Sequence, residues 1–469
     1  MPDIMDTLTI EQFGRRWREG DLAAAAVTDA CLRRIEADHA RLNAFIRVMA
    51  DDARRDAAAA DRERAAGRDR GPLHGVPIAI KDLIDIRGIP TTAASRVRDG
   101  HVAAMDALVI ARLRHAGAIL IGKTNLDEFA YGTTSENSAF GPVRNPHDPA
   151  RSPGGSSGGS AASVAAGMAL AALGTDTGGS IRIPAAACGT VGLKPTYGEV
   201  PADLVVPLSR TFDHVGPFAR TVGDAWLVYR ALLGSIEQRT LTPRPVSGVR
   251  MGLPRGYFCD VLDPDVRARF EEAVGALREG GAHVDEIGIR HAASTPAVYT
   301  HIHASEGAEY HATMIEAAPE RYTPAVRLRL EMGRYVLAED YARAMHGREV
   351  LRREVDAALA DHDALVLPTL PIPAPPIGAE SVVVDGAREP VRGLMLRLTQ
   401  LFNVTGHPAI SLPCGVTSQG LPCGLQLVGR RGETDALLQL ARACEAIVSS
   451  GRSQDRRTSS RTDRSRRFE

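Results

Sequence analysis

The feature that most constrains this chain is a pair of glycine- and serine-rich runs separated by an apolar segment of small residues. Residues 154–160 read GGSSGGS and residues 174–180 read GTDTGGS. The segment 160–173, SAASVAAGMALAAL, predicts a small-residue helix that is apolar nearly all round and therefore deeply buried. A flexible linker would have polar surroundings. Backbone with few Cβ atoms beside a buried helix instead predicts close approach of chain to chain or of chain to ligand.

Known glycine-rich motifs do not account for these runs. A phosphate-binding GxxxxGK[ST] loop needs a lysine, and none lies between residues 124 and 193. Residues 154–158, GGSSG, match the GxSxG elbow of serine hydrolases, but that elbow follows a strand. The preceding stretch VRNPHDPARSP reads as a loop, and no later histidine has a distinctive context. The serines therefore need a different base.

Lysine is nearly absent, which makes each lysine informative. Of the 56 basic residues only Lys81, Lys123 and Lys194 are lysine. Because arginine can supply any surface cation, a retained lysine is a candidate for losing its proton near neutral pH. Lys81 ends the apolar run 76–80, and burial lowers the pKa of an amine. We expect the other two lysines to be kept for packing and hydrogen bonding.

Serines and a lysine together can perform acyl transfer. A serine hydroxyl is a weak nucleophile until a base removes its proton. The backbone amides of Thr177, Gly178, Gly179 and Ser180 could then hold the developing oxyanion. These residues suffice for a Ser–Ser–Lys hydrolase without requiring one.

Composition narrows the class of protein. With 44% hydrophobic and 24% charged residues, the chain has the makeup of a soluble globular protein. A net charge of −1 gives no general attraction to nucleic acid or an anionic membrane, and no apolar run reaches the roughly 20 residues of a membrane span. Six scattered cysteines without metal spacing suit a reducing compartment. We expect a cytoplasmic enzyme without nucleic-acid or membrane partners.

The chain divides into three parts. Residues 1–70 predict a helical segment packed on the core, and residues 71–449 alternate strands and helices, including a long helical stretch over 296–360. Residues 450–469 are arginine-rich with almost nothing apolar, which predicts a disordered tail. His301 and His303 have the spacing of a possible metal pair, but no carboxylate completes a motif, so we expect ordinary helix histidines and no metal site.

The segment SPGGSSGGSAASVAAGMALAALGTDTGGSIRIPAAACGTVGLKPTYG (152–198) resembles the amidase signature family. The resemblance covers nearly the whole chain apart from the tail. It implies an α/β fold with a mixed central β-sheet covered by α-helices on both sides, no metal or organic cofactor, and a homodimer. Supporting matches lie at 71–95, 122–146, 365–378 and 407–429.

The resemblance also assigns roles. It places the nucleophile at Ser180, the bridging serine at Ser156 after a cis peptide bond from Gly155, and the base at Lys81. It further implies a supporting shell and an acyl pocket, whose variable lining is expected in 129–135, 199–213 and 300–345. The supporting residues are Ser157, Asp176 and Arg182, and the residues at the substrate are Ala130, Tyr131, Gly132 and Gly155.

The substrate is less determined. The glutaminase subunits of transfer-RNA amidotransferases (the A subunits) carry a segment resembling ARYDGVRYG, whereas residues 300–313 here read THIHASEGAEYHAT. We therefore expect a stand-alone hydrolase of small-molecule carboxamides or anilides, with carbamates (urethanes) as a further class. The alternatives are the glutaminase of a transfer-RNA-dependent amidotransferase and a catalytically silent amidase-like binding module.

Overall fold

The structure is a computed structural model that describes residues 4–465, with the exposure of side chains described up to residue 449. Its centre is an eleven-stranded mixed sheet, and a separate two-stranded hairpin lies outside it. The strands are β1 (Phe45–Val48), β2 (Pro77–Lys81), β3 (Ile119–Thr124), β4 (Ala171–Asp176), β5 (Val191–Lys194), β6 (His214–Ala219), β7 (Arg250–Pro254), β8 (His283–Ile287), β9 (Ala364–Pro368), β10 (Ser381–Val384), β11 (Ala387–Pro390), β12 (Ala409–Val416) and β13 (Pro422–Val428).

The large sheet has the order β1-β3-β2-β4-β6-β5-β12-β13-β9-β7-β8. The pairs among β3, β2 and β4 are parallel, as are those among β9, β7 and β8. The strands between β4 and β9 pair in antiparallel fashion, as β1 does with β3. Every residue of β2, β3, β4 and β6 is buried. Both faces of the sheet are therefore covered, which confirms the mixed α/β fold.

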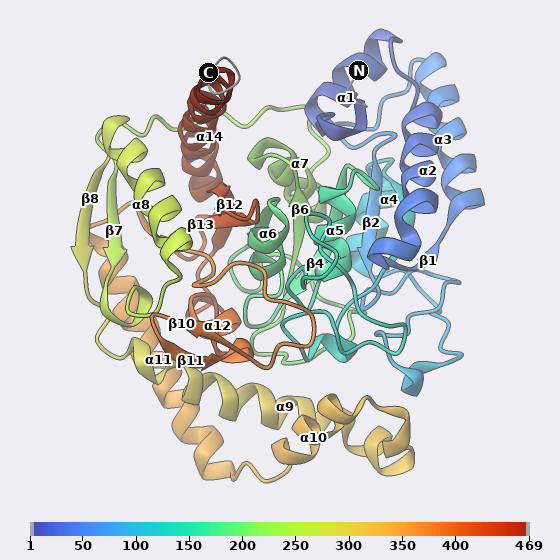
Figure 1. Ribbon diagram of the computed structural model, residues 1–469. Coiled ribbons are helices and arrows are strands. Elements are labelled where there is room, and N and C mark those ends of the chain that lie inside the picture. The colour runs from blue at the N-terminus through green and yellow to red at the C-terminus, as the bar shows by residue number, and fades with distance from the viewer. Residues whose placement is uncertain (1–3, 466–469) are drawn as a thin grey trace.

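Helices surround this sheet (Figure 1). α2 and α3 lie beside the edge that carries β1, α8 lies beside β7 and β8, and α9 to α11 form a layer along one end. Among the described helices, none combines the length and hydropathy that a bilayer crossing requires. The helices are α1 (Ile10–Glu19), α2 (Ala24–Leu42), α3 (Ala50–Ala65), α4 (Leu108–His115), α5 (Gly158–Ala165), α6 (Arg182–Cys188), α7 (Val222–Leu232), α8 (Pro264–Glu279), α9 (Thr295–Ala317), α10 (Pro324–Gly333), α11 (Ala338–Ala360), α12 (Val391–Arg397), α13 (Gln400–Val404) and α14 (Thr434–Ser465).

The helix predicted over 160–173 is correct in its burial but wrong in its extent. The helix α5 ends at Ala165, and β4 begins at Ala171. Gly167 adopts φ +68°, a left-handed conformation typical of the residue that follows a helix end. A run that is apolar on every side has no periodicity that distinguishes a buried helix from a buried strand.

The other predicted segments agree with the structure except at the tail. The stretch 296–360 forms α9 to α11, and the predicted strand pair near the end is the antiparallel pair β12–β13. α14 continues through Ser465, into the arginine-rich stretch for which composition predicts disorder. Adding a residue to an existing helix costs much less than starting one, so a helix can run on without apolar side chains. Residues 466–469 lie outside the described residues.

Candidate active site

Lys81 is the last residue of β2, and its side chain is completely buried. Its Nζ lies 2.9 Å from Ser156 Oγ, 2.7 Å from Ser157 Oγ and 2.8 Å from Thr175 Oγ1. Over the described side chains, no carboxylate forms an ion pair with this amine. Because hydroxyls both donate and accept, they can satisfy a neutral amine as well as an ammonium.

The burial of Lys81 decides its protonation. Burial lowers its pKa to about 7, although the carboxylates of Asp127, Asp213 and Asp176 act in the opposite direction. Desolvation prevails because none of these carboxylates is close enough to replace the water that the ammonium loses. At neutral pH a substantial fraction of Lys81 is a free amine, the form that can accept a proton.

The two glycine- and serine-rich runs meet at this amine. The Gly155–Ser156 peptide bond is cis, as the resemblance implies. The backbone N–H of Ser157 donates to the carbonyl oxygen of Ser180 at 3.3 Å, so the segments lie side by side. The hydroxyl of Ser157 also donates to the carbonyl of Thr175 at 3.1 Å. Residues far apart in the sequence are thus held around one buried base.

Ser180 lies in the turn between β4 and α6 and retains 5% exposure, so it can be reached from outside. Thr399 Oγ1 donates to the carbonyl oxygen of Gly178 at 2.6 Å. On the other side, Thr177 Oγ1 donates to Asp213 Oδ1 at 2.5 Å. The turn is therefore held from two directions.

The glycines of this turn have no room for a side chain. A Cβ on Gly178 would lie 2.5 Å from Tyr299 Oη and 3.0 Å from Leu396 Cδ2. A Cβ on Gly179 would lie 2.2 Å from Thr399 Oγ1, and Gly179 has φ +139°. Both positions need glycine because the surrounding structure closes directly onto the backbone.

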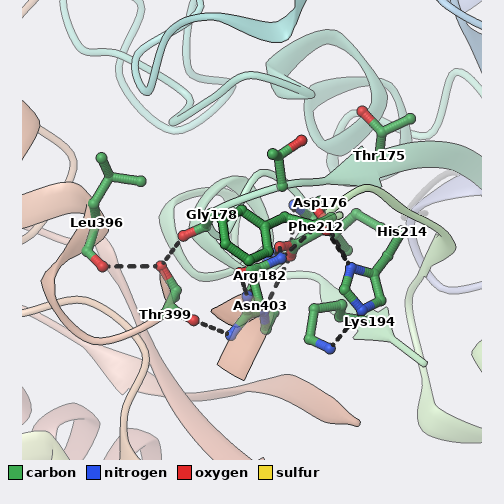
Figure 2. Close-up of polar contacts among 12 residues, drawn as sticks. Thr175, Asp176, Gly178, Arg182, Lys194, Phe212, His214, Leu396, Thr399 and Asn403 are labelled. Atoms are coloured by element: carbon green, nitrogen blue, oxygen red, sulfur yellow. Dashed lines mark hydrogen bonds and ion pairs between the residues drawn. The ribbon is translucent and has the colours of Figure 1, made fainter. Parts of the chain in front are cut away.

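A buried ion pair lies beneath the turn (Figure 2). Arg182 Nη2 lies 2.9 Å from Asp176 Oδ1 and its Nε lies 3.0 Å from Asp176 Oδ2, with both side chains inaccessible to solvent. Arg182 also donates to Thr399 O, Gln426 Oε1 and Asn403 Oδ1 at 2.9, 2.7 and 2.6 Å. Although burial alone raises the pKa of a carboxyl, Arg182 and the other donors hold the pKa of Asp176 well below its usual range. The predicted locking of the loop thus has a full set of contacts.

Lys194 and His214 extend this network (Figure 2). Lys194 Nζ lies 3.2 Å from His214 Nε2 and donates to the carbonyl oxygens of Pro195 and His407 at 3.1 and 2.5 Å. His214 Nδ1 faces the carbonyl of Asp176 at 3.1 Å. Burial lowers the pKa of both Lys194 and His214. These contacts agree with the predicted packing and hydrogen-bonding role of Lys194.

Lys123, the remaining lysine, is an ion-pair partner. Its Nζ lies 2.8 Å from Asp82 Oδ1, with both side chains buried. It also donates to Ile84 O at 2.9 Å and Thr91 Oγ1 at 3.0 Å. The structural role expected of Lys123 fits these contacts.

Tyr131, expected at the acyl pocket, is buried in an aromatic and cationic surrounding. Its ring meets His303 edge-on, with the centroids 5.4 Å apart. The guanidinium carbons of Arg329 and Arg392 lie 5.9 and 5.7 Å from the ring centroid. The neighbouring Ala130 has φ +60°, a left-handed conformation that is unusual for alanine.

Gly132 and Gly155 both lie against Asp127. A Cβ on Gly132 would be 2.1 Å from Asp127 Cγ, and one on Gly155 would be 2.4 Å from its Oδ2. The carboxylate is buried and accepts from the backbone N–H groups of residues 135–137. The absence of side chains at the two glycines is thus required by packing on this carboxylate, whatever their contact with substrate.

A pocket of about 440 Å³ lies on the other side of the base. Its lining comes mainly from residues 197–215, which include the loop predicted as variable lining. Thr175, which contacts the Lys81 amine, and Asp213, which accepts from Thr177, both line it. This pocket therefore borders the same buried base as the two serines.

The comparisons with known proteins agree with this geometry. A protein-family model described as Amidase matches residues 26–438. This chain belongs to the amidase family. It is 41% identical over 428 residues to an amidase of Pseudomonas putida, covering 88% of this chain and 90% of the relative. The chain is thus an amidase-family hydrolase of C–N bonds.

Other relatives of this amidase have different names. It is 39% identical over 481 residues to the A subunit of the glutamyl-tRNA(Gln) amidotransferase of Roseiflexus sp. (strain RS-1), covering 95% of this chain and 97% of the relative. A solved amidase structure superposes with a TM-score of 0.89 at 39% identity, covering 94% of this chain and 99% of that one. The corresponding amidotransferase protein of Thermotoga maritima gives a TM-score of 0.76 at 33% identity, covering 94% of each chain.

Some residues of the amidase site were missed by sequence reasoning. Thr175 supplies a third hydroxyl to the base, and its position before the predicted Asp176 was the only available signal. Asp213 and Thr399 hold the nucleophile turn from distant parts of the chain. No local pattern marks such residues, because they act through long-range contacts.

The histidines of α9 have ordinary helical contacts. His301 Nδ1 and His303 Nδ1 face the carbonyl oxygens of Ala297 and Tyr299 at 2.7 and 2.8 Å. Burial lowers the pKa of His303 to about 3. Over the described residues, no group of three or more metal-binding side chains is found.

Proposed function

We propose that this amidase cleaves the C–N bond of small-molecule carboxamides and anilides through an acyl-enzyme on Ser180, with Ser156 as proton relay and Lys81 as base. The observation that carries the proposal is the buried Lys81 amine, 2.9 Å from Ser156 Oγ, with a pKa lowered to about 7. A lysine buried among hydroxyls and close to neutrality is suited to general-base catalysis.

Acylation begins with neutral Lys81. Ser180 Oγ attacks the carbonyl carbon while its proton passes to Ser156, and Ser156 passes its own proton to Lys81. The carbonyl oxygen becomes an oxyanion, which the backbone amides of Thr177, Gly178, Gly179 and Ser180 are proposed to hold. The glycines permit this approach because their positions lack side chains.

The proton must then return to nitrogen. An amide anion is a very poor leaving group, so the C–N bond breaks as Lys81 gives its proton back through Ser156 to that nitrogen. Water next attacks the acyl-enzyme, losing one proton along the same relay. Ser180 leaves as the alcohol, and the enzyme returns to its starting state.

The class of substrate rests on the surroundings of the site. Tyr131 and its aromatic neighbours offer an apolar acyl pocket, and Ala130, Gly132 and Gly155 are proposed to contribute backbone to it. Carbamates are a further proposed class, because the same acylation can cleave them. The proposed partner is the small-molecule substrate, without nucleic acid or membrane.

The second candidate function is that of the glutaminase in a transfer-RNA-dependent amidotransferase. The 39% identity to the Roseiflexus protein favours it. The higher TM-score with the solved amidase, 0.89 against 0.76, supports the stand-alone hydrolase. A purified chain tested with anilides, aliphatic amides, carbamates and glutamine separates the two. Release of ammonia from glutamine only after partner subunits are added would establish the second candidate.

The nucleophile is tested by covalent labelling. A serine-directed fluorophosphonate should label the purified protein at one site, and Ser180→Ala should abolish labelling and activity. Ser163→Ala is a matched control, because Ser163 is also buried and donates to the carbonyl of Ser160, within α5. Unchanged labelling of Ser180→Ala would overturn the proposal and would equally support a binding module if activity is absent.

The relay is tested by a change of leaving group. Lys81→Ala should lose amidase activity much more severely than activity on a nitrophenyl ester, whose leaving group needs no proton. Equal losses on both substrates would count against proton return through Lys81.

Two further proposals concern the protein as a whole. The described cysteines are all free, which supports location in the cytoplasm. A homodimer is proposed from family resemblance, and light scattering on the purified protein would show its mass directly.

A further inference from the structure

We propose that Asp213 is a positioning residue for the turn that carries Ser180, and that the turn keeps its working geometry only while this carboxyl group is ionised. The inference rests on the proposed function, because it concerns the same nucleophile and base. It adds a second ionisation to the catalytic cycle, on a residue that touches neither Ser180 nor substrate.

The position of Asp213 follows from strand pairing. β6 begins at His214, which pairs with Asp176 at the end of β4. Asp213 is therefore placed next to Thr177, the first residue of the turn, and accepts its hydroxyl at 2.5 Å. Thr177 has no comparable side-chain partner elsewhere in the described residues. The contact consequently fixes one end of the turn.

The other oxygen of this carboxylate is also occupied. Asp213 Oδ2 accepts the backbone N–H groups of Leu208 and Ser209 at 2.9 and 3.1 Å. An ionised carboxylate only accepts, which matches three donors. A protonated carboxyl must either release a donor or turn the Thr177 hydroxyl round, and a neutral hydrogen bond is roughly half as strong as a charge-assisted one. Protonation should therefore loosen the turn.

The surroundings bring this ionisation close to neutral pH. Burial raises the pKa of Asp213 to about 6, against the lowering effect of its three donors, and Glu306 on α9 adds to the rise. Asp213 in turn raises the pKa of Lys81. The charged and titratable groups that face Asp213 or share its pocket are Lys81, Asp176, Tyr197, Asp203, Arg210, His214, Tyr299 and Glu306.

Asp213 has its own access to solvent. It lines the pocket of about 440 Å³ together with Thr175, on the side of the base formed by residues 197–215. A proton can therefore reach the carboxyl group through this pocket. The group can titrate during turnover even when substrate covers Ser180.

The sign of the effect can be worked out from both groups. Lys81 must be neutral, so activity rises with pH through about 7. Asp213 must be ionised, so activity also rises through about 6. On a logarithmic plot, kcat/KM should fall with a slope near one just below pH 7 and approach two below about pH 6.

The test is a set of pH profiles of kcat and kcat/KM on an anilide. Asp213→Asn should lower kcat about tenfold with KM within about twofold, as expected of a misplaced catalytic group. Its acid limb should have a slope of one throughout. The remaining break should also move to lower pH, because Lys81 loses a carboxylate that stabilised its ammonium form.

Two variants separate charge from contact. Thr177→Val removes the hydroxyl but keeps the carboxylate, so kcat should fall while the break due to Lys81 stays in place. Glu306→Gln removes a like charge, so only the lower break should move, to lower pH, with kcat unchanged above pH 8. These two variants carry the test if Asp213→Asn does not fold.

The outcomes are distinguishable from failure of the proposed function. If the wild-type protein is not labelled by fluorophosphonate at Ser180, the proposed function fails. If it is labelled and active, but Asp213→Asn changes kcat without changing the slope or the break, Asp213 is merely structural and the inference is overturned. An unmoved lower break in Glu306→Gln would overturn it as well.

Discussion

Replacing Arg182 by methionine tests how the amidase holds its nucleophile turn. Methionine keeps much of the length of the side chain but removes every donor. Asp176 would remain buried without its counter-ion, and the contacts to Thr399, Gln426 and Asn403 would be lost together. The Asp176 carboxylate would keep only the amide of Asn403 at 2.8 Å and backbone donors such as Ile181 N at 3.1 Å.

The expected magnitude comes from the burial of both partners. Removing one member of a fully buried ion pair typically costs about 3–5 kcal/mol, because an uncompensated charge remains in the interior. Both Arg182 and Asp176 are inaccessible to solvent, so screening by water does not reduce this figure. We expect a loss of about 3–5 kcal/mol in the free energy of unfolding.

The assay is urea unfolding followed by circular dichroism and by tryptophan fluorescence, with coincident transitions as the check for two-state behaviour. Asp176→Asn with Arg182→Met forms the double variant of a cycle. It should be less destabilised than the sum of the two single variants, since no unpaired charge remains. A single-variant loss below about 1 kcal/mol, or costs that simply add, would refute the reasoning.

The pH dependence of the same comparison has a definite sign. Because the pKa of Asp176 is held below its usual value, the stabilisation by the pair is complete above the unfolded pKa of about 4 and is lost as pH falls below it. The difference between wild type and Arg182→Met should therefore be constant from about pH 6 to 8 and shrink in acid.

Three further predictions concern buried positions. Lys123→Met should reduce the free energy of unfolding by about 3 kcal/mol in urea, because Asp82 loses its buried counter-ion, and an unchanged midpoint would contradict this. Gly132→Ala should lower the melting temperature, since the new Cβ would lie 2.1 Å from Asp127 Cγ; a melting temperature equal to wild type would show that the carboxylate can move aside. Gly275→Ala, where nothing lies within 4 Å, should instead stabilise α8 by about 0.5–1 kcal/mol, and a loss there would count against the packing argument.

The parts of the fold that sequence predicted well have strong local signals. The helical stretch 296–360 and the strand pair β12–β13 were identified because periodicity and turn residues mark them. The segment 160–173 lacks such marks, since its small apolar residues suit a buried helix and a buried strand equally. Only the left-handed Gly167 separates α5 from β4, and a glycine alone does not reveal the direction that the chain takes after it.

The candidate site divides in the same way. Lys81 could be selected from the sequence because lysine is rare in this chain and follows an apolar run. Asp213 could not, because its importance comes from Thr177, 36 residues away, through the pairing of β4 with β6. Thr399 contacts Gly178 across 221 residues. Such residues become recognisable only when strand order is known.

All three lysines of this amidase are completely buried, so the folded chain presents no ε-amine at its surface. Reagents that acylate lysine side chains can therefore modify them only when the core opens. Coupling to activated resins through lysine would select unfolded molecules, and the rate of lysine labelling would report directly on the opening of the fold. The arginine-rich surface thus makes the lysines a built-in record of conformational integrity.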